Sequence, residues 1–191
     1  MRSLGIVLLR CYALPARYGK FLSYIETQRL LLRTWMESDF ADAMTIFGDE
    51  ETMRAAGGAR SPKRVKAMID RMMERQNNEE PALWPAILKS EMSFVGVCGL
   101  IPLESSGDIE IGWHFARRVW GMGLAYEASS AVLKYGFEEL QLERIVCVIH
   151  PMNRRSIALA NRLGFRFERV ARHYGFDLLR YAKSRSAVIP S

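Results

Sequence analysis

The sequence is poor in cysteine, with three such residues among 191 and none of them in a CxxC pair or a Cys/His cluster. The odd number and this spacing argue against a disulfide framework and against a zinc site. Cys98 and Cys147 lie inside apolar runs, where we expect buried and unreactive thiols. We therefore predict no metal in the functional site and a location in the reducing cytoplasm.

A membrane-spanning segment is also missing from the N-terminal region. The apolar run at residues 5–9, between Arg2 and Arg10, is far too short to cross a bilayer. It is also short for a signal-peptide core, and no clean small-residue cleavage site follows it. We predict no membrane partner, and we interpret residues 1–24 as an N-terminal extension outside the folded domain.

The chain has no internal repeat and no low-complexity linker, and its length suggests one domain. Hydrophobic residues make up 49% of it, which is enough for a substantial core. The formal net charge of +6 favours anionic partners. Nucleic acid, a membrane surface and a phosphate-rich cofactor all satisfy that balance, so charge alone does not decide between them.

Hydrophobic periodicity predicts strands and helices from residue 29 onward. Ser61 and Pro62 are typical of a helix start, and Gly164 is typical of a helix end. Residues 108–113 alternate polar or small with large apolar side chains, which predicts a strand with one buried face. We predict strands at residues 29–33, 82–89, 93–103, 108–113, 144–149, 165–170 and 176–181, and helices at residues 40–47, from 61 onward, 124–139 and 153–163.

This order places antiparallel hairpins early and one β-α-β crossover late in the chain. It indicates an α/β fold with a mixed, mostly antiparallel central sheet of about six to seven strands and flanking helices. We place the folded domain at residues 25–183 and a C-terminal tail at residues 184–191.

A glycine-containing turn, Arg118-x-x-Gly121-x-Gly123, lies between a predicted strand and a predicted helix. Glycines at such a turn let the backbone approach a ligand closely and adopt positive φ. The amides at the start of the following helix carry partial positive charge, which suits a pyrophosphate. Taken alone, the turn is equally explained as a tight connection with solvated arginines.

The surrounding sequence resembles the GNAT superfamily of acyl-CoA N-acyltransferases, whose pyrophosphate loop has the pattern Gln/Arg-x-x-Gly-x-Gly/Ala. It is similar, more narrowly, to the branch that includes ribosomal-protein N-terminal acetyltransferases. The resemblance covers residues 25–183. The segments that carry it are Thr27-Gln-Arg-Leu-Leu-Leu-Arg33, Glu110-Ile-Gly-Trp-His114, Trp120-Gly-Met-Gly-Leu-Ala-Tyr-Glu-Ala128, Asn153-x-x-Ser156 and Leu163-Gly-Phe165.

The resemblance implies acetyl-CoA as co-substrate, bound in an opening between the strands at residues 108–113 and 144–149. The pantetheine arm would pair with backbone at residues 111–115, and the pyrophosphate would lie on the amides of residues 119–124. A helix N-cap is the alternative role of Asn153, and both roles are compatible. The cofactor-binding residues implied are Trp113, His114, Phe115, Arg118, Val119, Gly121, Met122, Gly123, Leu124, Ala125, Asn153 and Ser156.

Glu110 is the candidate catalytic base. An amine must be neutral to attack a thioester, whereas a lysine-like amine has a pKa of about 10.4. A proton acceptor, direct or through water, is therefore needed. In many relatives the matching strand Glu has this role; a structural Glu bonded to backbone or to an arginine is the alternative. A backbone amide near His114 would stabilise the oxyanion.

The general acid stays open at the sequence level. Many family members carry a tyrosine four residues before the Gly-Phe pair, and Ala160 occupies that position here. Tyr174, Tyr181 and Ser156 are candidates. No acid is needed if the thiol, with a pKa of about 8.5, leaves unaided.

The predicted activity is acetyl transfer from acetyl-CoA to a primary amine, a protein N-terminus or a small molecule, by direct attack. An acyl-CoA-binding domain without turnover is one alternative, and a basic nucleic-acid-binding protein is another. We expect nucleic acid not to be the main partner, because the basic residues are scattered. A dinucleotide-binding oxidoreductase is disfavoured, because the third glycine of its loop is missing.

The sequence does not identify the acceptor amine. Acceptors in the resembled branch include protein N-termini, free amino acids, polyamines and antibiotics. We expect Gly57-Gly-Ala-Arg60 and the following helix to frame the acceptor entrance. We expect a monomer or a homodimer.

Overall fold

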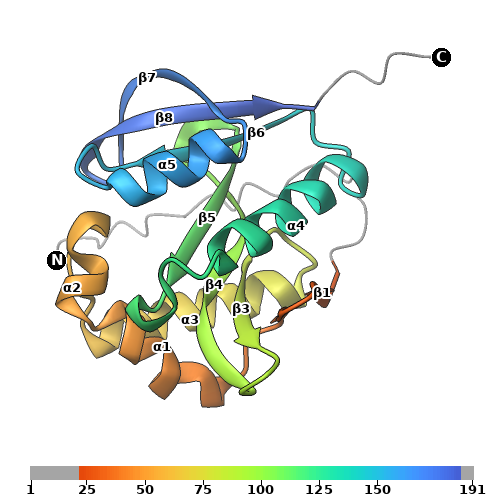
Figure 1. The fold of residues 1–191 in the computed structure, drawn as a ribbon, viewed down its shortest axis with the longest axis vertical. Coiled ribbons are helices and arrows are strands. Elements are labelled where there is room, and N and C mark those ends of the chain that lie inside the picture. The colour runs from red at the N-terminus through yellow and green to blue at the C-terminus, as the bar shows by residue number, and fades with distance from the viewer. Residues whose placement is uncertain (1–21, 186–191) are drawn as a thin grey trace, which may run out of the picture.

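The computed structural model describes residues 22–185, which form one eight-stranded sheet with helices on both faces (Figure 1). The strand order is β1-β2-β3-β4-β5-β6-β8-β7. The N-terminal extension and the C-terminal tail, apart from residues 22–24, 184 and 185, lie outside the described residues. The strands are β1 (Tyr24–Glu26), β2 (Leu30–Arg33), β3 (Leu83–Leu88), β4 (Ser93–Pro102), β5 (Ile109–Phe115), β6 (Arg144–Ile149), β7 (Arg166–His173) and β8 (Phe176–Ser184).

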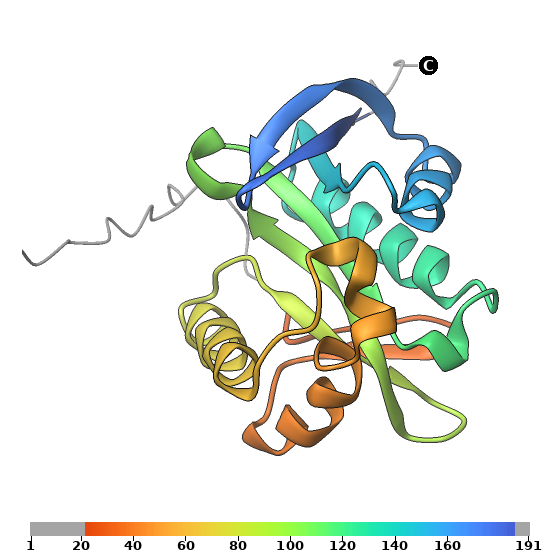
Figure 2. The same cartoon turned by 90° about the vertical axis from the view of Figure 1, so that its left-hand side faces the viewer.

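The helices divide between the two faces of the sheet. Figure 2 shows α3 on one side of the sheet and α4 on the other. Helix α4 packs on β4 and β5, α5 packs on β6, and α1 packs on α3 and β4. None of the helices in residues 22–185 is long and apolar enough to cross a membrane. The helices are α1 (Phe40–Phe47), α2 (Glu50–Met53), α3 (Pro62–Asn77), α4 (Leu124–Glu138) and α5 (Arg154–Arg162).

Local sequence explains where the helices that frame the site begin. Ser61 precedes α3 and accepts a hydrogen bond from the Arg64 amide, and Pro62 occupies the first turn. Asn153 precedes α5 and its side chain accepts from the Ser156 amide at 3.1 Å. Each cap satisfies a backbone amide that the helix itself leaves unpaired.

The pairing of β5 with β6 is limited to one point. All other strand pairs among the described residues are antiparallel, whereas β5 and β6 run parallel with a single registered pair, Glu110 and Val146. Beyond it, β5 remains paired with β4 as far as Phe115, and β6 remains paired with β8. The sheet therefore opens between β5 and β6 while each strand keeps its other neighbour.

Most of the predicted architecture is confirmed. The α/β class, the mostly antiparallel sheet, the hairpin of β3 with β4 and the late β-α-β crossover are all present. The sheet has eight strands rather than six to seven, because the three-residue strand β1 pairs with β2. Helix α2 and the short 3₁₀ turns were not predicted, since segments this short carry no periodic pattern.

The prediction that residues 108–113 form a strand with only one buried face is wrong for the first half of β5. Ile109, Glu110 and Ile111 are all buried, so both faces are covered there. The polar residue in that run faces the interior. Alternation of residue type shows which side chains share a face, but it does not show whether other elements cover the polar face.

Close contact between β3 and β4 requires a glycine at position 99. A Cβ there would lie 2.3 Å from the Ala82 carbonyl oxygen and 2.7 Å from the Leu83 Cα atom, both backbone atoms. We expect Gly99→Ala to lower the free energy of unfolding by about 1–3 kcal/mol, as overpacking does. Urea unfolding followed by circular dichroism measures this.

Gly112, the cross-strand partner of Gly99, is the matched control. The nearest atom to a Cβ at Gly112 is the terminal Leu83 Cδ2 atom at 3.1 Å, and a side-chain end can move. We expect Gly112→Ala to change stability by less than about 1 kcal/mol. Equal unfolding midpoints for the two variants would contradict the proposed backbone contact.

Candidate active site

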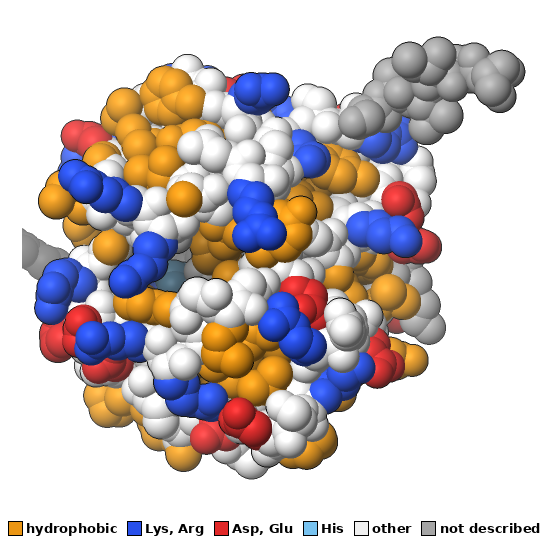
Figure 3. Space-filling view, viewed as in Figure 1, with side chains coloured by type: hydrophobic (Ala, Val, Ile, Leu, Met, Phe, Trp, Pro, Cys, Tyr) orange, Lys and Arg blue, Asp and Glu red, His pale blue; other side chains and the backbone are white. Residues whose placement is uncertain are grey.

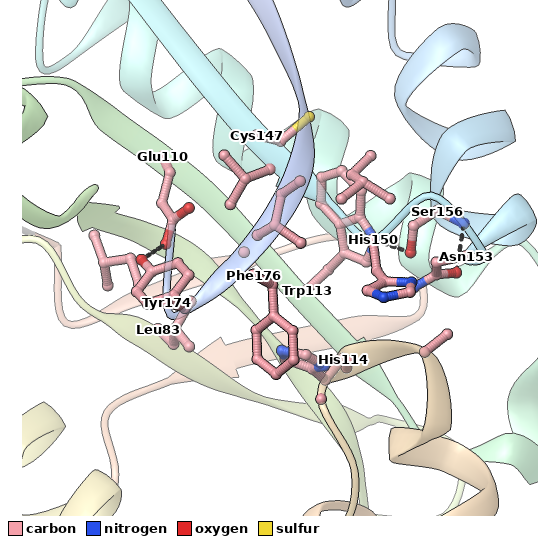
Figure 4. Close-up of a pocket in the computed structure, with 18 of the residues that line it drawn as sticks. Leu83, Glu110, Trp113, His114, Cys147, His150, Asn153, Ser156, Tyr174 and Phe176 are labelled. Atoms are coloured by element: carbon pink, nitrogen blue, oxygen red, sulfur yellow. Dashed lines mark hydrogen bonds between the residues drawn. The ribbon is translucent and has the colours of Figure 1, made fainter. Parts of the chain in front are cut away.

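A cavity of about 630 Å³ lies where β5 and β6 separate. Its walls come from β5 and β6, the start of α5, the face of α3 with the loop before it, and the turn between β7 and β8. Figure 4 shows Glu110, Trp113, His114, Cys147 and Tyr174 around this space. The strand opening and the residues on both sides of it therefore form one site.

Glu110 lies in the wall of this cavity and is 5% exposed. Burial raises the pKa of its carboxyl group to about 7, and the nearby charge of Glu104 acts in the same direction. A hydrogen bond from the Tyr174 hydroxyl to Glu110 opposes that rise. A carboxyl group with a pKa near 7 can both accept and release a proton at physiological pH.

Tyr174 reaches Glu110 from the turn between β7 and β8 (Figure 4). Its φ of 53° lies in the left-handed region, and its amide donates to Glu104 Oε2 at 2.9 Å. The side chain is 45% exposed, while its hydroxyl contacts the buried carboxyl. Burial and the neighbouring carboxylates raise the pKa of Tyr174 well above its ordinary value, so its hydroxyl keeps its proton.

Of the three candidates for the general acid, two line the cavity. Tyr174 and Ser156 do so, whereas Tyr181 is buried against the ring of Phe167. Ala160, at the position that carries a tyrosine in many relatives, is fully buried. Contact between Tyr174 and Glu110 joins residues 64 positions apart, and no sequence pattern indicated it.

His114 lines the same cavity but is held neutral. Burial lowers the pKa of its imidazole to about 3, with a further contribution from the charge of Arg60. Its ring lies edge-on to the Phe47 ring, with 5.4 Å between centroids. An imidazole with so low a pKa does not act as a base near neutral pH.

The glycine turn before α4 presents unpaired backbone amides. Gly121 and Gly123 have φ of 81° and 78°, a region that favours glycine. The amides of Val119, Trp120 and Met122 close turns onto carbonyl oxygens. Within residues 22–185, no hydrogen bond engages the amides of Gly121, Gly123, Leu124 or Ala125. These amides are available to an anion at the helix start.

Arg118 uses its side chain to hold the turn against the β3–β4 hairpin. Its guanidinium donates to the Phe94 carbonyl at 2.9 Å and lies 3.5 Å from Glu91. Its assignment as a cofactor ligand stays a prediction.

A second set of polar contacts that holds the glycine turn was not predicted. Arg29 pairs with Glu127 at 2.7 Å and donates to the Met122 carbonyl oxygen at 2.9 Å. The Glu127 carboxylate also accepts from the Thr27 hydroxyl at 2.6 Å. Arg29 and Glu127 are 98 positions apart, so only the folded sheet and α4 bring them together.

The start of α5 closes the other side of the cavity. The N-cap interpretation of Asn153 is confirmed, and Trp113 Nε1 donates to Ser156 Oγ at 3.2 Å. All three residues line the cavity, as Figure 4 shows. Cofactor contacts from them stay predictions, as do those from Phe115, Val119, Gly121, Met122, Gly123, Leu124 and Ala125.

The two described cysteines are buried free thiols, as predicted. Burial raises the pKa of Cys98 to about 12 and raises that of Cys147 as well. Cys147 lines the cavity beside the strand opening. Thiols with pKa values this high are poor nucleophiles at neutral pH.

The family model of the GNAT acetyltransferase domain matches residues 29–166. This match spans the strand opening, the glycine turn and the start of α5. The chain belongs to the GNAT acetyltransferases. It is therefore an acetyl-CoA-dependent acyltransferase, in agreement with the resemblance found in its sequence.

Relatives of similar length share about a third of their residues with this GNAT chain. The uncharacterized protein YkkB of Bacillus subtilis (strain 168) is 31% identical over 82% of this chain and 93% of its own length. The uncharacterized N-acetyltransferase p20 of Bacillus licheniformis is 31% identical over 78% of this chain and 85% of its own length.

Solved GNAT structures share the fold. The GNAT-family acetyltransferase of Bacillus anthracis is 27% identical with a TM-score of 0.70, over 83% of this chain and 95% of its own. RimL, a ribosomal alpha-N-protein acetyltransferase solved in complex with coenzyme A, is 17% identical with a TM-score of 0.71. The match covers 86% of this chain and 99% of RimL. The branch predicted from the sequence is thus found among the structural neighbours.

The glycine turn yields a test of cofactor binding. A Cβ at Gly121 would meet no atom of the described chain within 4 Å, so a side chain there would project into the space beside the free amides. We expect Gly121→Val to abolish acetyl-CoA binding measured by calorimetry, because the side chain would block the phosphates.

Gly107 supplies the matched control, because it also has positive φ, 75°, and no atom within 4 Å of a Cβ. Gly107→Val carries the same kind of backbone strain away from the turn. We expect its affinity for acetyl-CoA to equal that of the unsubstituted chain. Unchanged affinity in Gly121→Val would remove the turn from the cofactor site.

Proposed function

We propose that this chain transfers the acetyl group of acetyl-CoA to a primary amine, with Glu110 as the proton acceptor. The observation that carries the proposal is the position of Glu110, buried in the cavity wall at the last pair before β5 and β6 separate. Its pKa of about 7 suits a base at neutral pH.

The site fits coenzyme A on two features of the chain. The glycine turn offers unpaired amides at the start of α4, and no described atom occupies the space where a Gly121 side chain would lie. Along β5, residues beyond Glu110 have no strand partner on the β6 side within the described sheet. We propose that the amides hold the pyrophosphate and that this open edge pairs with the pantetheine amides.

Bound acetyl-CoA would supply an activated acetyl thioester. The chain's own contribution begins with the proton, since an alkyl amine is mostly protonated at neutral pH. The ionised Glu110 carboxylate takes this proton, directly or through water. The Tyr174 hydroxyl orients the carboxyl by donating to it. The neutral amine would then attack the thioester carbonyl, and a free amide on β5 near His114 would stabilise the oxyanion. Breaking of the C–S bond would release coenzyme A as a thiolate, which takes up a proton from water.

A protein N-terminus and a small-molecule amine both satisfy this scheme. RimL is a ribosomal alpha-N-protein acetyltransferase, and this supports an N-terminal acceptor by analogy alone. The cytoplasmic location and the monomeric or homodimeric state stay predictions from the sequence.

A panel of amines tests the activity. Purified full-length chain is incubated with acetyl-CoA and peptide N-termini, amino acids, amino-acid amides or polyamines, and free thiol is measured with a thiol reagent. We expect thiol release above the no-amine rate with at least one class, matched by acetylated product in mass spectrometry. Binding of acetyl-CoA with no release on any member would favour a binding domain without turnover.

Glu110→Gln tests the proton acceptor. We expect intact acetyl-CoA affinity and lower turnover, because a carboxamide cannot accept the proton. Burial raises the pKa of Glu110 to about 7, so the ionised form increases as pH rises through that value. The ratio of kcat/KM between the unsubstituted chain and Glu110→Gln should therefore rise up to about pH 7 and then level off.

Glu74→Gln is the control, because Glu74 is an exposed carboxylate of α3. We expect its kcat/KM to follow the unsubstituted chain at every pH. A ratio for Glu110→Gln that stays constant from about pH 6 to about pH 9 would exclude Glu110 as the base.

A further inference from the structure

We propose that the acceptor carries an oxyanion, a carboxylate or a phosphate group, close to its reacting amine, and that Arg60, Arg64 and Arg71 bind this group. The inference rests on the proposed function, because it concerns the acceptor half of the same cavity. All three arginines line the cavity that contains Glu110. From the sequence we expect this region to frame the acceptor entrance, and the structure adds its charge.

The arginines occupy one wall of the cavity. Arg60 lies in the loop before α3, and Arg64 and Arg71 follow on the helix with the spacing of one face, together with Met68. Figure 3 shows a hollow in the face of the molecule that it views, with Lys and Arg side chains beside it. Arg64 and Arg71 are exposed and Arg60 is partly buried, so this wall of the cavity carries positive charge.

Protein carboxylates do not neutralise this wall. Within residues 22–185, no ion pair or hydrogen bond joins Arg60, Arg64 or Arg71 to an acidic side chain. Arg60 lies 4.9 Å over the Phe47 ring and donates to Met68 Sδ at 3.1 Å. A guanidinium has five N–H donors, so most of those on Arg60 stay available.

Burial makes this arrangement costly without a ligand. Burial lowers the pKa of Arg60, and the charges of Arg71 and Arg64 lower it further. A half-buried cation among like charges is stabilised when an anion arrives. Unpaired guanidinium groups facing a cavity are therefore typical of a site that binds carboxylate or phosphate.

The phosphates of coenzyme A are not the expected occupants of this wall. The proposed phosphate site is the turn before α4, and α4 packs on the opposite face of the sheet from α3 (Figure 2). Glu110, Gly112 and His114 share one face of β5 and line the cavity with the arginines. The cationic wall therefore faces the acceptor rather than the far end of the cofactor.

The same wall disfavours cationic acceptors. A polyamine would bring further positive charge beside three arginines, and like charges that close repel. An amine with its own carboxylate places that group on the arginines and its ammonium near Glu110. The acceptor class is consequently a zwitterionic or anionic amine.

Pairs of amines that differ by one charge test the inference. The panel contains an amino acid and its amide, a peptide with glutamate or glutamine after its first residue, and ethanolamine phosphate with ethanolamine. We expect the anionic member of at least one pair to exceed its neutral partner in kcat/KM by about tenfold or more, as charge-assisted hydrogen bonds do. The pair that shows this difference identifies whether the bound anion is an α-carboxylate, a side-chain carboxylate or a phosphate.

Arg60→Gln and Arg64→Gln link the preference to the wall. We expect each substitution to reduce severalfold the ratio of kcat/KM between the anionic amine and its neutral partner. Arg64 is exposed, so its substitution does not threaten folding, and acetyl-CoA affinity serves as a check on both. Lys63→Gln removes a positive charge from the same helix outside the cavity and should leave the ratio unchanged.

Equal kcat/KM within every pair, or a preference that survives both arginine substitutions, would overturn the inference while leaving the transferase activity standing. Calorimetric binding of the same pairs to the CoA-loaded chain measures the preference without turnover. Anion-selective binding with no thiol release would instead sink the proposed activity and retain the anion site. No difference in binding within any pair would overturn the site itself.

Discussion

The separation of β5 from β6 after a single pair is the constraint on which the site depends. Glu110 and Val146 are the registered pair, and within the described sheet the rest of β5 pairs with β4 and the rest of β6 pairs with β8. Since β5 stays fully paired with β4 and β6 with β8, the sheet remains intact. The edge of β5 that faces β6 is nevertheless left without a strand partner in the described sheet. Backbone groups at such an edge need partners. An extended ligand with amides of its own, such as pantetheine, would supply them.

The position of Glu110 at this branch point explains its chemistry. A residue at the end of the pairing is still covered by the sheet, so it is 5% exposed, yet it borders the cavity. Burial raises its pKa, and the Tyr174 hydroxyl from a distant turn moderates the rise. Burial favours the protonated carboxyl group and the hydrogen bond favours the carboxylate, and the balance suits a base near neutral pH.

The fold was largely predictable because its signals are local. Strand alternation, the Ser61 and Asn153 caps and the glycines before α4 each depend on neighbours in the chain. Glu110 was predictable through family resemblance. The contact of Glu110 with Tyr174 and the ion pair of Arg29 with Glu127 were not predictable, because they join residues 64 and 98 positions apart. The pairing of β1 with β2 and the burial of Glu110 likewise depend on tertiary packing, which the local sequence pattern does not show.

The proposed anion site and the proposed base would act on different groups of the acceptor. Burial raises the pKa of Glu110, and the charge of Glu104 adds to this rise. Burial raises the pKa of Tyr174, which Arg71 partly opposes, and burial lowers the pKa of His114, to which Arg60 adds. An oxyanion bound to the arginines would place the amine of the acceptor near Glu110. The arginines would then position the acceptor while Glu110 receives the proton.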